Sequence, residues 1–88
     1  MHHILVCDDE ADIVAALKIY LESDGYCVHT ASNGAEALQI ARGGQVQLAL
    51  LDIMMPGMDG ITAMAKLREF SNIPVILLTA KSEDSDKI

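Results

Sequence analysis

Residues 48–60 read LALLDIMMPGMDG and combine an apolar run, a turn and a helix start. Leu48–Leu51 is a continuous apolar run of strand length that ends abruptly in Asp52. A continuous apolar run is typical of a parallel strand buried on both faces. Pro56-Gly57 predicts a turn, and Asp59 is placed to cap a following helix. The stretch therefore predicts a buried strand with an acidic side chain at its carboxyl end, followed by a helix.

The same alternation of strand and helix extends to both sides of this stretch. Apolar runs over 4–7 and 75–78 predict two more strands, and the alternating residues 27–31 predict a fourth. Asn33 with Glu36 is typical of a capping box. Helical spacing predicts two inward-facing stripes: Ile13, Val14, Leu17, Tyr20 and Leu21 in the first helix, and Ile61, Met64, Ala65 and Leu67 in the third. Residues 82–88 resemble the start of a fourth helix.

The resulting order is βαβαβαβ, which predicts an α/β, doubly wound parallel sheet in one domain over 1–88. Because residues 27–31 alternate instead of forming a continuous apolar run, they should form an edge strand. The flavodoxin-like order 2-1-3-4-5 meets this condition, so we expect the order 2-1-3-4 for the four strands present.

Composition narrows the class of function. The chain has 88 residues, of which 51% are hydrophobic, and a formal charge of −7. That charge disfavours direct contact with nucleic acid and favours cations or basic protein surfaces. The apolar runs are too short to span a membrane, and the first residues lack the features of a signal peptide, so the expected location is the cytoplasm.

Carboxylates follow two of the predicted central strands. Asp8 and Asp9 end the first strand, Asp52 ends the third, and Thr79 follows the fourth. The carboxyl ends of parallel strands meet at one edge, where α/β sheets bind ligands. Three carboxylates this close together favour a hard divalent cation such as Mg²⁺. The alternative is that Asp9 and Asp52 are ordinary cap or turn residues.

Together, Asp8-Asp9, residues 50–60 (LLDIMMPGMDG) and Leu77-Leu78-Thr79-Ala80 resemble the response-regulator receiver family, and residues 78–81 (LTAK) are most similar to its OmpR/PhoB subfamily. The resemblance implies a CheY-like fold and a phosphoacceptor domain rather than an enzyme. Its implied partner is a sensor histidine kinase, and its implied output is transcription through a DNA-binding domain absent from this chain.

The resemblance also implies residue roles. Asp52 would be the nucleophile that takes the phosphoryl group, and Thr79 would contact that group and switch with it. Asp8, Asp9, Asp52 and the backbone carbonyl of Met54 would hold Mg²⁺. The family pattern continues with a fifth strand, which ends in a Lys-Pro pair, and a fifth helix, whereas this sequence stops at Ile88. We therefore expect residues 75–88 to expose apolar surface and to mediate self-association.

Three other functions compete with this interpretation. A haloacid-dehalogenase-like phosphatase would need a second aspartate two residues after Asp52, where this chain has Met54. A flavin or nucleotide binder would need a phosphate-cradling first loop in place of residues 8–10. The third alternative is a non-phosphorylatable structural receiver fragment.

The cysteines and the amino-terminal histidines need separate interpretation. Cys7 and Cys27 fall at opposite ends of neighbouring parallel strands, which predicts that they are not bonded. His2 and His3 are interpreted as an ordinary N-terminus, with a metal site as the alternative.

Overall fold

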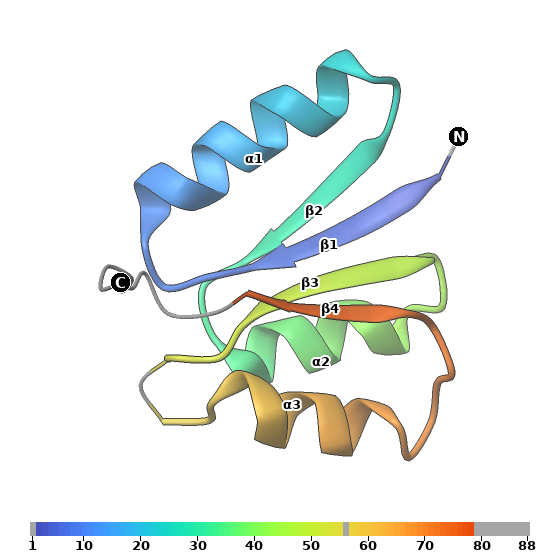
Figure 1. Ribbon diagram of the computed structural model, residues 1–88. Helices are drawn as coiled ribbons and strands as arrows, with labels where there is room; N and C mark the ends of the chain where they lie inside the picture. Colours follow the sequence, from blue (N-terminus) through green and yellow to red (C-terminus); the bar gives the residue numbers. More distant parts are fainter. Residues whose placement is uncertain (1, 56, 79–88) are drawn as a thin grey trace.

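The computed structural model describes residues 2–55 and 57–78, which form a parallel sheet with helices on both faces (Figure 1). The elements are β1 (His3–Cys7), α1 (Ala11–Ser23), β2 (Cys27–Ala31), α2 (Gly34–Arg42), β3 (Leu48–Asp52), α3 (Gly60–Leu67) and β4 (Val75–Leu78). The strand order is β2-β1-β3-β4, and each neighbouring pair is parallel. The predicted α/β class, strand order and edge position of residues 27–31 are confirmed.

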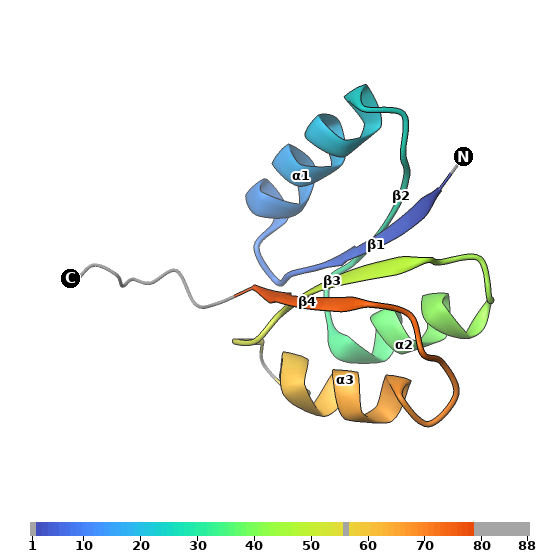
Figure 2. The same ribbon diagram turned by 45° about the vertical axis from the view of Figure 1, so that its right-hand side comes forward.

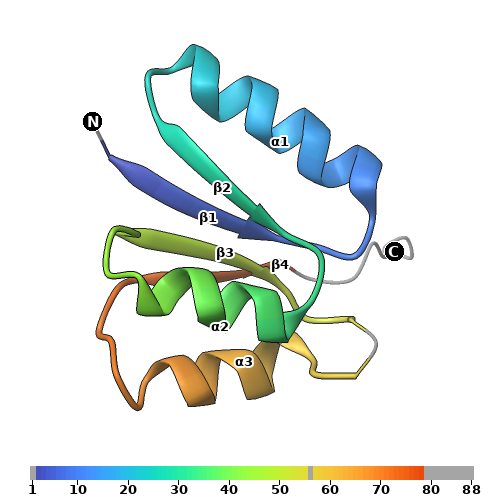
Figure 3. The same ribbon diagram turned by 180° about the vertical axis from the view of Figure 1, so that it is seen from behind.

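The sheet separates two apolar layers. α1 covers β1 and β2 on one face, whereas α2 and α3 lie side by side on the other (Figures 1 and 3). The larger core, beneath α2 and α3, includes Leu5, Leu51 and Leu67. The smaller core, beneath α1, contains Ile4, Val6 and Val28. The central strands therefore have buried side chains on both faces, as their continuous apolar sequences indicate.

Two helices begin at the predicted caps. The Asn33 side chain accepts a hydrogen bond from the Glu36 backbone N–H at 2.9 Å, and Asp59 accepts one from the Thr62 N–H at 2.7 Å. Glu36 reaches back to the backbone N–H of Ser32 at 2.9 Å and to its hydroxyl at 3.0 Å. The predicted capping box is confirmed, although its return hydrogen bonds come from the residue before the cap.

Some predicted core positions are wrong. Tyr20 is 65% exposed and Ile61 is 52% exposed, and Ala65 is also exposed. In α3, the predicted Leu67 is buried and Met64 is half-buried, and the rest of the inward face consists of Gly60 and Ala63. Spacing alone leaves the rotation of a short helix undetermined, and here Gly60 lies close against the backbone of Asp52 and Ile53.

β4 lies at the edge of the sheet formed by the described residues, next to β3 (Figure 2). Its Ile76 is 51% exposed. This residue points to the same face of the sheet as α1, but α1 packs against β1 and β2 and leaves β4 uncovered. Exposed apolar surface is therefore present at β4, but self-association itself stays a prediction, and residues 79–88 lie outside the described part.

The two cysteines are free, as predicted. In the register of β1 and β2, Cys27 lies opposite His3 and Cys7 lies opposite Ala31, so the two thiols are at opposite ends of the strand pair. Among the described residues, no helix is long and apolar enough to cross a membrane.

Candidate functional site

Three aspartates meet at the carboxyl edge of the sheet. Asp8 directly follows β1, Asp52 is the last residue of β3, and the two strands are neighbours whose register pairs Cys7 with Leu51. Asp8 is 3% exposed and Asp52 is 1% exposed, whereas Asp9 is exposed. One carboxylate oxygen from each of the three lies within 4.8 Å of the others. The convergence predicted from the strand ends is thus confirmed.

Backbone N–H groups orient the two buried carboxylates. Asp8 Oδ1 accepts a hydrogen bond from the Glu10 N–H at 2.9 Å, and Asp52 Oδ1 accepts one from the Met54 N–H at 3.1 Å. Both hydrogen bonds span two residues, so each aspartate also shapes the loop after its strand. Asp9 does not cap α1, because the N-cap is Glu10 and no side-chain hydrogen bond forms there. The ordinary cap explanation is therefore wrong for Asp9, whereas Asp52 does play a turn role beside any chemistry.

Gly60 allows α3 to begin against the site. A Cβ at this position would meet the backbone carbonyl of Asp52 closer than real Cβ atoms come to such neighbours, and it would also press tightly against the Cα of Ile53. The Gly60 N–H also donates to the Ile53 carbonyl at 3.0 Å. Glycine is thus needed here for close approach of backbone to backbone. Sequence reasoning did not single out Gly60, although its place after the capping Asp59 was the available signal.

The negative potential of the cluster extends into the core. Burial, the largest cause, raises the pKa of the Cys7 thiol from its ordinary value, and together with the nearby charges of Asp8, Asp52, Glu36 and Asp9, in that order of effect, it brings this pKa to about 12. Burial disfavours the charged thiolate, and deprotonating Cys7 would also add a negative charge beside the carboxylates, so both effects raise the pKa. A cation at the carboxyl edge would relieve this repulsion.

The donor set matches a hard divalent cation. It consists entirely of carboxylate oxygens. Mg²⁺ and Ca²⁺ prefer such oxygen ligands, whereas soft metals prefer sulfur. Only Asp9 of the three is exposed, and it lines an open groove beside α1 together with Asp8, Lys18, Ser32 and Glu36. An ion arriving from that groove would reach the exposed carboxylate first and the buried pair behind it.

Of the two remaining predicted site residues, the structure describes Met54 but not Thr79. Met54 is in the loop after β3 and is 59% exposed, and a second hollow near it is lined by Ile53, Met54, Met55 and Asp59. Thr79 lies outside the described residues. The last described strand residue, Leu78, pairs with Asp52 in the register of β3 and β4.

Comparison with known proteins agrees with this arrangement. The family model described as "Response regulator receiver domain" matches residues 4–88. Transcriptional regulatory protein SrrA from Staphylococcus aureus is 45% identical over 87 residues, covering 99% of this chain and 36% of SrrA. The chain thus spans about a third of the length of the curated relatives it matches.

Solved structures give the same result. The response regulator TrrA from Thermotoga maritima, in complex with Mg²⁺ and BeF, is 43% identical with a TM-score of 0.85, covering 93% of this chain and 72% of TrrA. A structure of histidine kinase ThkA in complex with TrrA gives a match with 40% identity and a TM-score of 0.86, covering 100% of this chain and 77% of the matched chain.

Proposed function

Because this chain belongs to the response-regulator receiver domain family, we propose that it is a phosphoacceptor whose Asp52 takes a phosphoryl group from a sensor histidine kinase. The observation that carries the proposal is the acidic cluster, in which the buried Asp52 lies within 4.8 Å of two further carboxylates at the carboxyl edge of the sheet. The complex of TrrA with a histidine kinase supports the class of partner.

The local geometry suits Asp52 as a nucleophile. The Met54 N–H holds one of its carboxylate oxygens, which limits rotation of the side chain. In the transfer, a carboxylate oxygen of Asp52 forms a bond to phosphorus as the bond from phosphorus to the kinase histidine nitrogen breaks. The product is an acyl phosphate, and the histidine ring leaves with the electron pair. Such a reaction depends on positioning and charge neutralisation more than on new covalent chemistry.

We propose that Asp8, Asp9, Asp52 and the backbone carbonyl of Met54 hold Mg²⁺. The all-oxygen donor set of the three aspartates supports this assignment, and TrrA was solved with Mg²⁺ and BeF. When bound, Mg²⁺ neutralises the charge of the acceptor carboxylate and of the incoming phosphoryl group. Asp8 and Asp9 contribute by holding negative charge beside the nucleophile, which favours cation binding over direct phosphate binding.

The proposed output is transcription, because SrrA is a transcriptional regulatory protein of which this chain matches about a third. We propose that Thr79 contacts the phosphoryl group and changes position with it, which would connect phosphorylation to a DNA-binding domain in a longer protein. A phosphatase of the haloacid-dehalogenase type is less well supported, since Met54 has no proton to donate at the position of the required acid.

The test is phosphorylation of the purified chain with radiolabelled acetyl phosphate in the presence and absence of Mg²⁺. We expect an alkali-labile label on the wild-type chain, loss of label in Asp52→Asn, and retention in the matched control Asp24→Asn. Reduction of the labelled protein with borohydride should convert the acyl phosphate at position 52 to homoserine, which peptide mass spectrometry locates directly.

Three outcomes would contradict the proposal: label that persists in Asp52→Asn, label that maps to another residue, or labelling that does not depend on Mg²⁺. Steady hydrolysis of acetyl phosphate with a proton donor identified elsewhere would favour the phosphatase instead. Circular dichroism of each variant checks that a lost label does not reflect a lost fold.

A further inference from the structure

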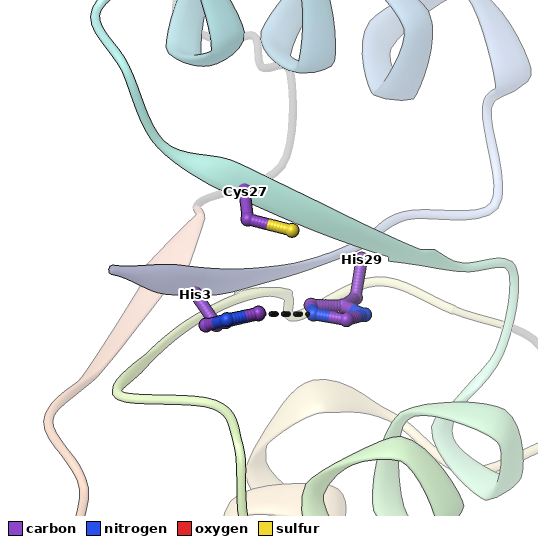
Figure 4. Close-up of side chains that lie close together, drawn as sticks. All are labelled: His3, Cys27 and His29. Atoms are coloured by element: carbon purple, nitrogen blue, oxygen red, sulfur yellow. Dashed lines mark hydrogen bonds between the residues drawn. The ribbon is translucent and has the colours of Figure 1, made fainter. Parts of the chain in front are cut away.

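A second cluster of ligating side chains lies at the opposite end of the sheet from the aspartates. His3, Cys27 and His29 project from β1 and β2 toward one another on the same face (Figure 4). His3 Nδ1 lies 2.8 Å from His29 Nε2, and the two rings stack with centroids 5.1 Å apart. One ligand atom from each of the three residues lies within 4.8 Å of the others.

The strand register explains this convergence. His3 is directly opposite Cys27, and His29 is two residues further along β2, so all three side chains stand on one face of neighbouring strands. Strands about 4.8 Å apart, with side chains about 7 Å apart along one strand, bring such tips within reach of one ion. The backbone is already in place, because the Cys27 N–H donates to the His2 carbonyl at 2.8 Å.

Further hydrogen bonds hold the His3 side of the cluster. The His3 N–H donates to the side-chain oxygen of Gln47 at 2.8 Å, and the Gln47 N–H donates to the His3 carbonyl at 2.8 Å. All three cluster side chains are half-buried, so they are partly shielded from water but still reachable. Their positions are therefore largely set before any ligand arrives, which lowers the entropy cost of binding.

We propose that His3, Cys27 and His29 form a binding site for a borderline-soft divalent cation, for which Zn²⁺ is the probe. Two imidazoles and one thiolate are ligands of this class, whereas Mg²⁺ and Ca²⁺ require oxygen. Three protein ligands leave the fourth position of a tetrahedral ion to water. This site is separate from the proposed phosphoacceptor function, because it uses none of the aspartates.

The distances between the ligand atoms of His3, Cys27 and His29 are close to those of a tetrahedral zinc site. With Zn–N bonds of about 2.0 Å and a Zn–S bond of about 2.3 Å, tetrahedral ligand atoms lie roughly 3.3–3.6 Å apart. The two histidine nitrogens, now 2.8 Å apart, would separate by roughly half an ångström. The thiol would approach from within 4.8 Å. Small rotations of side chains suffice, and neither strand has to move.

The protons balance on binding. The Cys27 thiol releases its proton to solvent, because the thiolate is the metal ligand. The hydrogen bond between the two rings breaks, and each neutral ring carries its single N–H on the nitrogen that faces away from the ion. The ion then joins the edge strand β2 to the central strand β1 through side chains as well as backbone. Since the unfolded chain lacks this arrangement, binding stabilises the fold.

The test uses the chain without a polyhistidine tag and with Co²⁺ as a spectroscopic substitute for Zn²⁺. We expect a near-ultraviolet charge-transfer band from thiolate to cobalt and the intense visible bands of a tetrahedral site. Zn²⁺ should displace Co²⁺ and protect Cys27 from alkylation. Cys27→Ser should abolish the sulfur band, and His29→Gln should weaken Zn²⁺ binding by at least about tenfold in competition with a chromophoric chelator.

Two controls separate this site from others. His2→Gln changes a neighbouring exposed histidine outside the cluster and should leave Zn²⁺ affinity unchanged. The aspartate cluster has no sulfur, so it cannot give the charge-transfer band. Absence of that band in the wild-type chain overturns the proposal, whatever the variants do. A band that survives Cys27→Ser, or an affinity loss as large in His2→Gln as in His29→Gln, also overturns it.

Discussion

Replacing Asp9 by asparagine should make the metal-free chain more stable and its response to Mg²⁺ smaller. Asp9 is exposed, and its carboxylate lies within 4.8 Å of those of both Asp8 and Asp52. Two ionised carboxylates at the 4.8 Å limit repel by about 0.9 kcal/mol at the dielectric of water and by about 3.5 kcal/mol at an effective dielectric near 20. Exposure places Asp9 close to the lower limit, so removing its two repulsions is worth about 2 kcal/mol.

A second effect opposes this gain. Asp9 precedes α1, which begins at Ala11, and a negative charge beside a helix amino terminus contributes about 0.3–1 kcal/mol of stability. The net gain in the free energy of unfolding for Asp9→Asn without metal is therefore about 1 kcal/mol, which raises Tm by about 4 °C or more in a chain of this size. Salt at about 1 M should reduce this gain in stability, because the Debye length then falls to about 3 Å and the repulsion between exposed carboxylates is screened.

With Mg²⁺ bound, the wild-type chain should be more stable than Asp9→Asn, the reverse of their order without metal. At a concentration 100 times its Kd, Mg²⁺ stabilises the wild-type chain by about 2.7 kcal/mol, whereas a site weakened tenfold contributes about 1.4 kcal/mol. Thermal unfolding followed by circular dichroism, with and without Mg²⁺, measures both effects. The control is Asp24→Asn, the same change at the other end of α1 and about 20 Å away. Equal metal-free Tm values, or equal Mg²⁺ increments, for Asp9→Asn and wild type would refute the reasoning.

Three further predictions concern the scaffold. Gly60→Ala should lower the free energy of unfolding by about 1–3 kcal/mol in urea titrations, because the new Cβ meets the backbone of Asp52. Gly34→Ala is the control and should lower the free energy of unfolding less, since the nearest neighbour of Gly34 is a flexible methionine side chain. Hydrogen bonds from Ser32 hold the pKa of Glu36 below its ordinary 4.5, so Glu36 stabilises the fold above that pH and loses this effect as pH falls through its lowered pKa. Glu36→Gln should therefore be less stable than wild type at neutral pH and equal to it in strong acid, and a constant difference would contradict this. Light scattering over a concentration series should show self-association that Ile76→Lys reduces, and a wild-type monomer at every concentration would contradict the role expected for residues 75–88.

The positions of the helix starts could be predicted from the sequence, but the rotation of each helix about its own axis could not. The caps Asn33 and Asp59 were predictable, because an N-cap depends on contacts within one helical turn. Tyr20 and Ile61 were assigned to inward faces and are exposed. Their burial depends on how α1 and α3 are rotated against the sheet, which is settled by packing between segments far apart in the sequence.

The sequence by itself determined the α/β class, the strand order and the meeting of Asp8, Asp9 and Asp52. Alternation, continuous apolar runs and parallel strand ends are properties of short segments combined with general rules of chain topology. Only the tertiary structure placed His3 against Cys27 and His29, because that contact depends on the residue-by-residue register of β1 against β2. A shift of one residue would turn the side chains of one strand to the opposite face, and packing of the whole core prevents it.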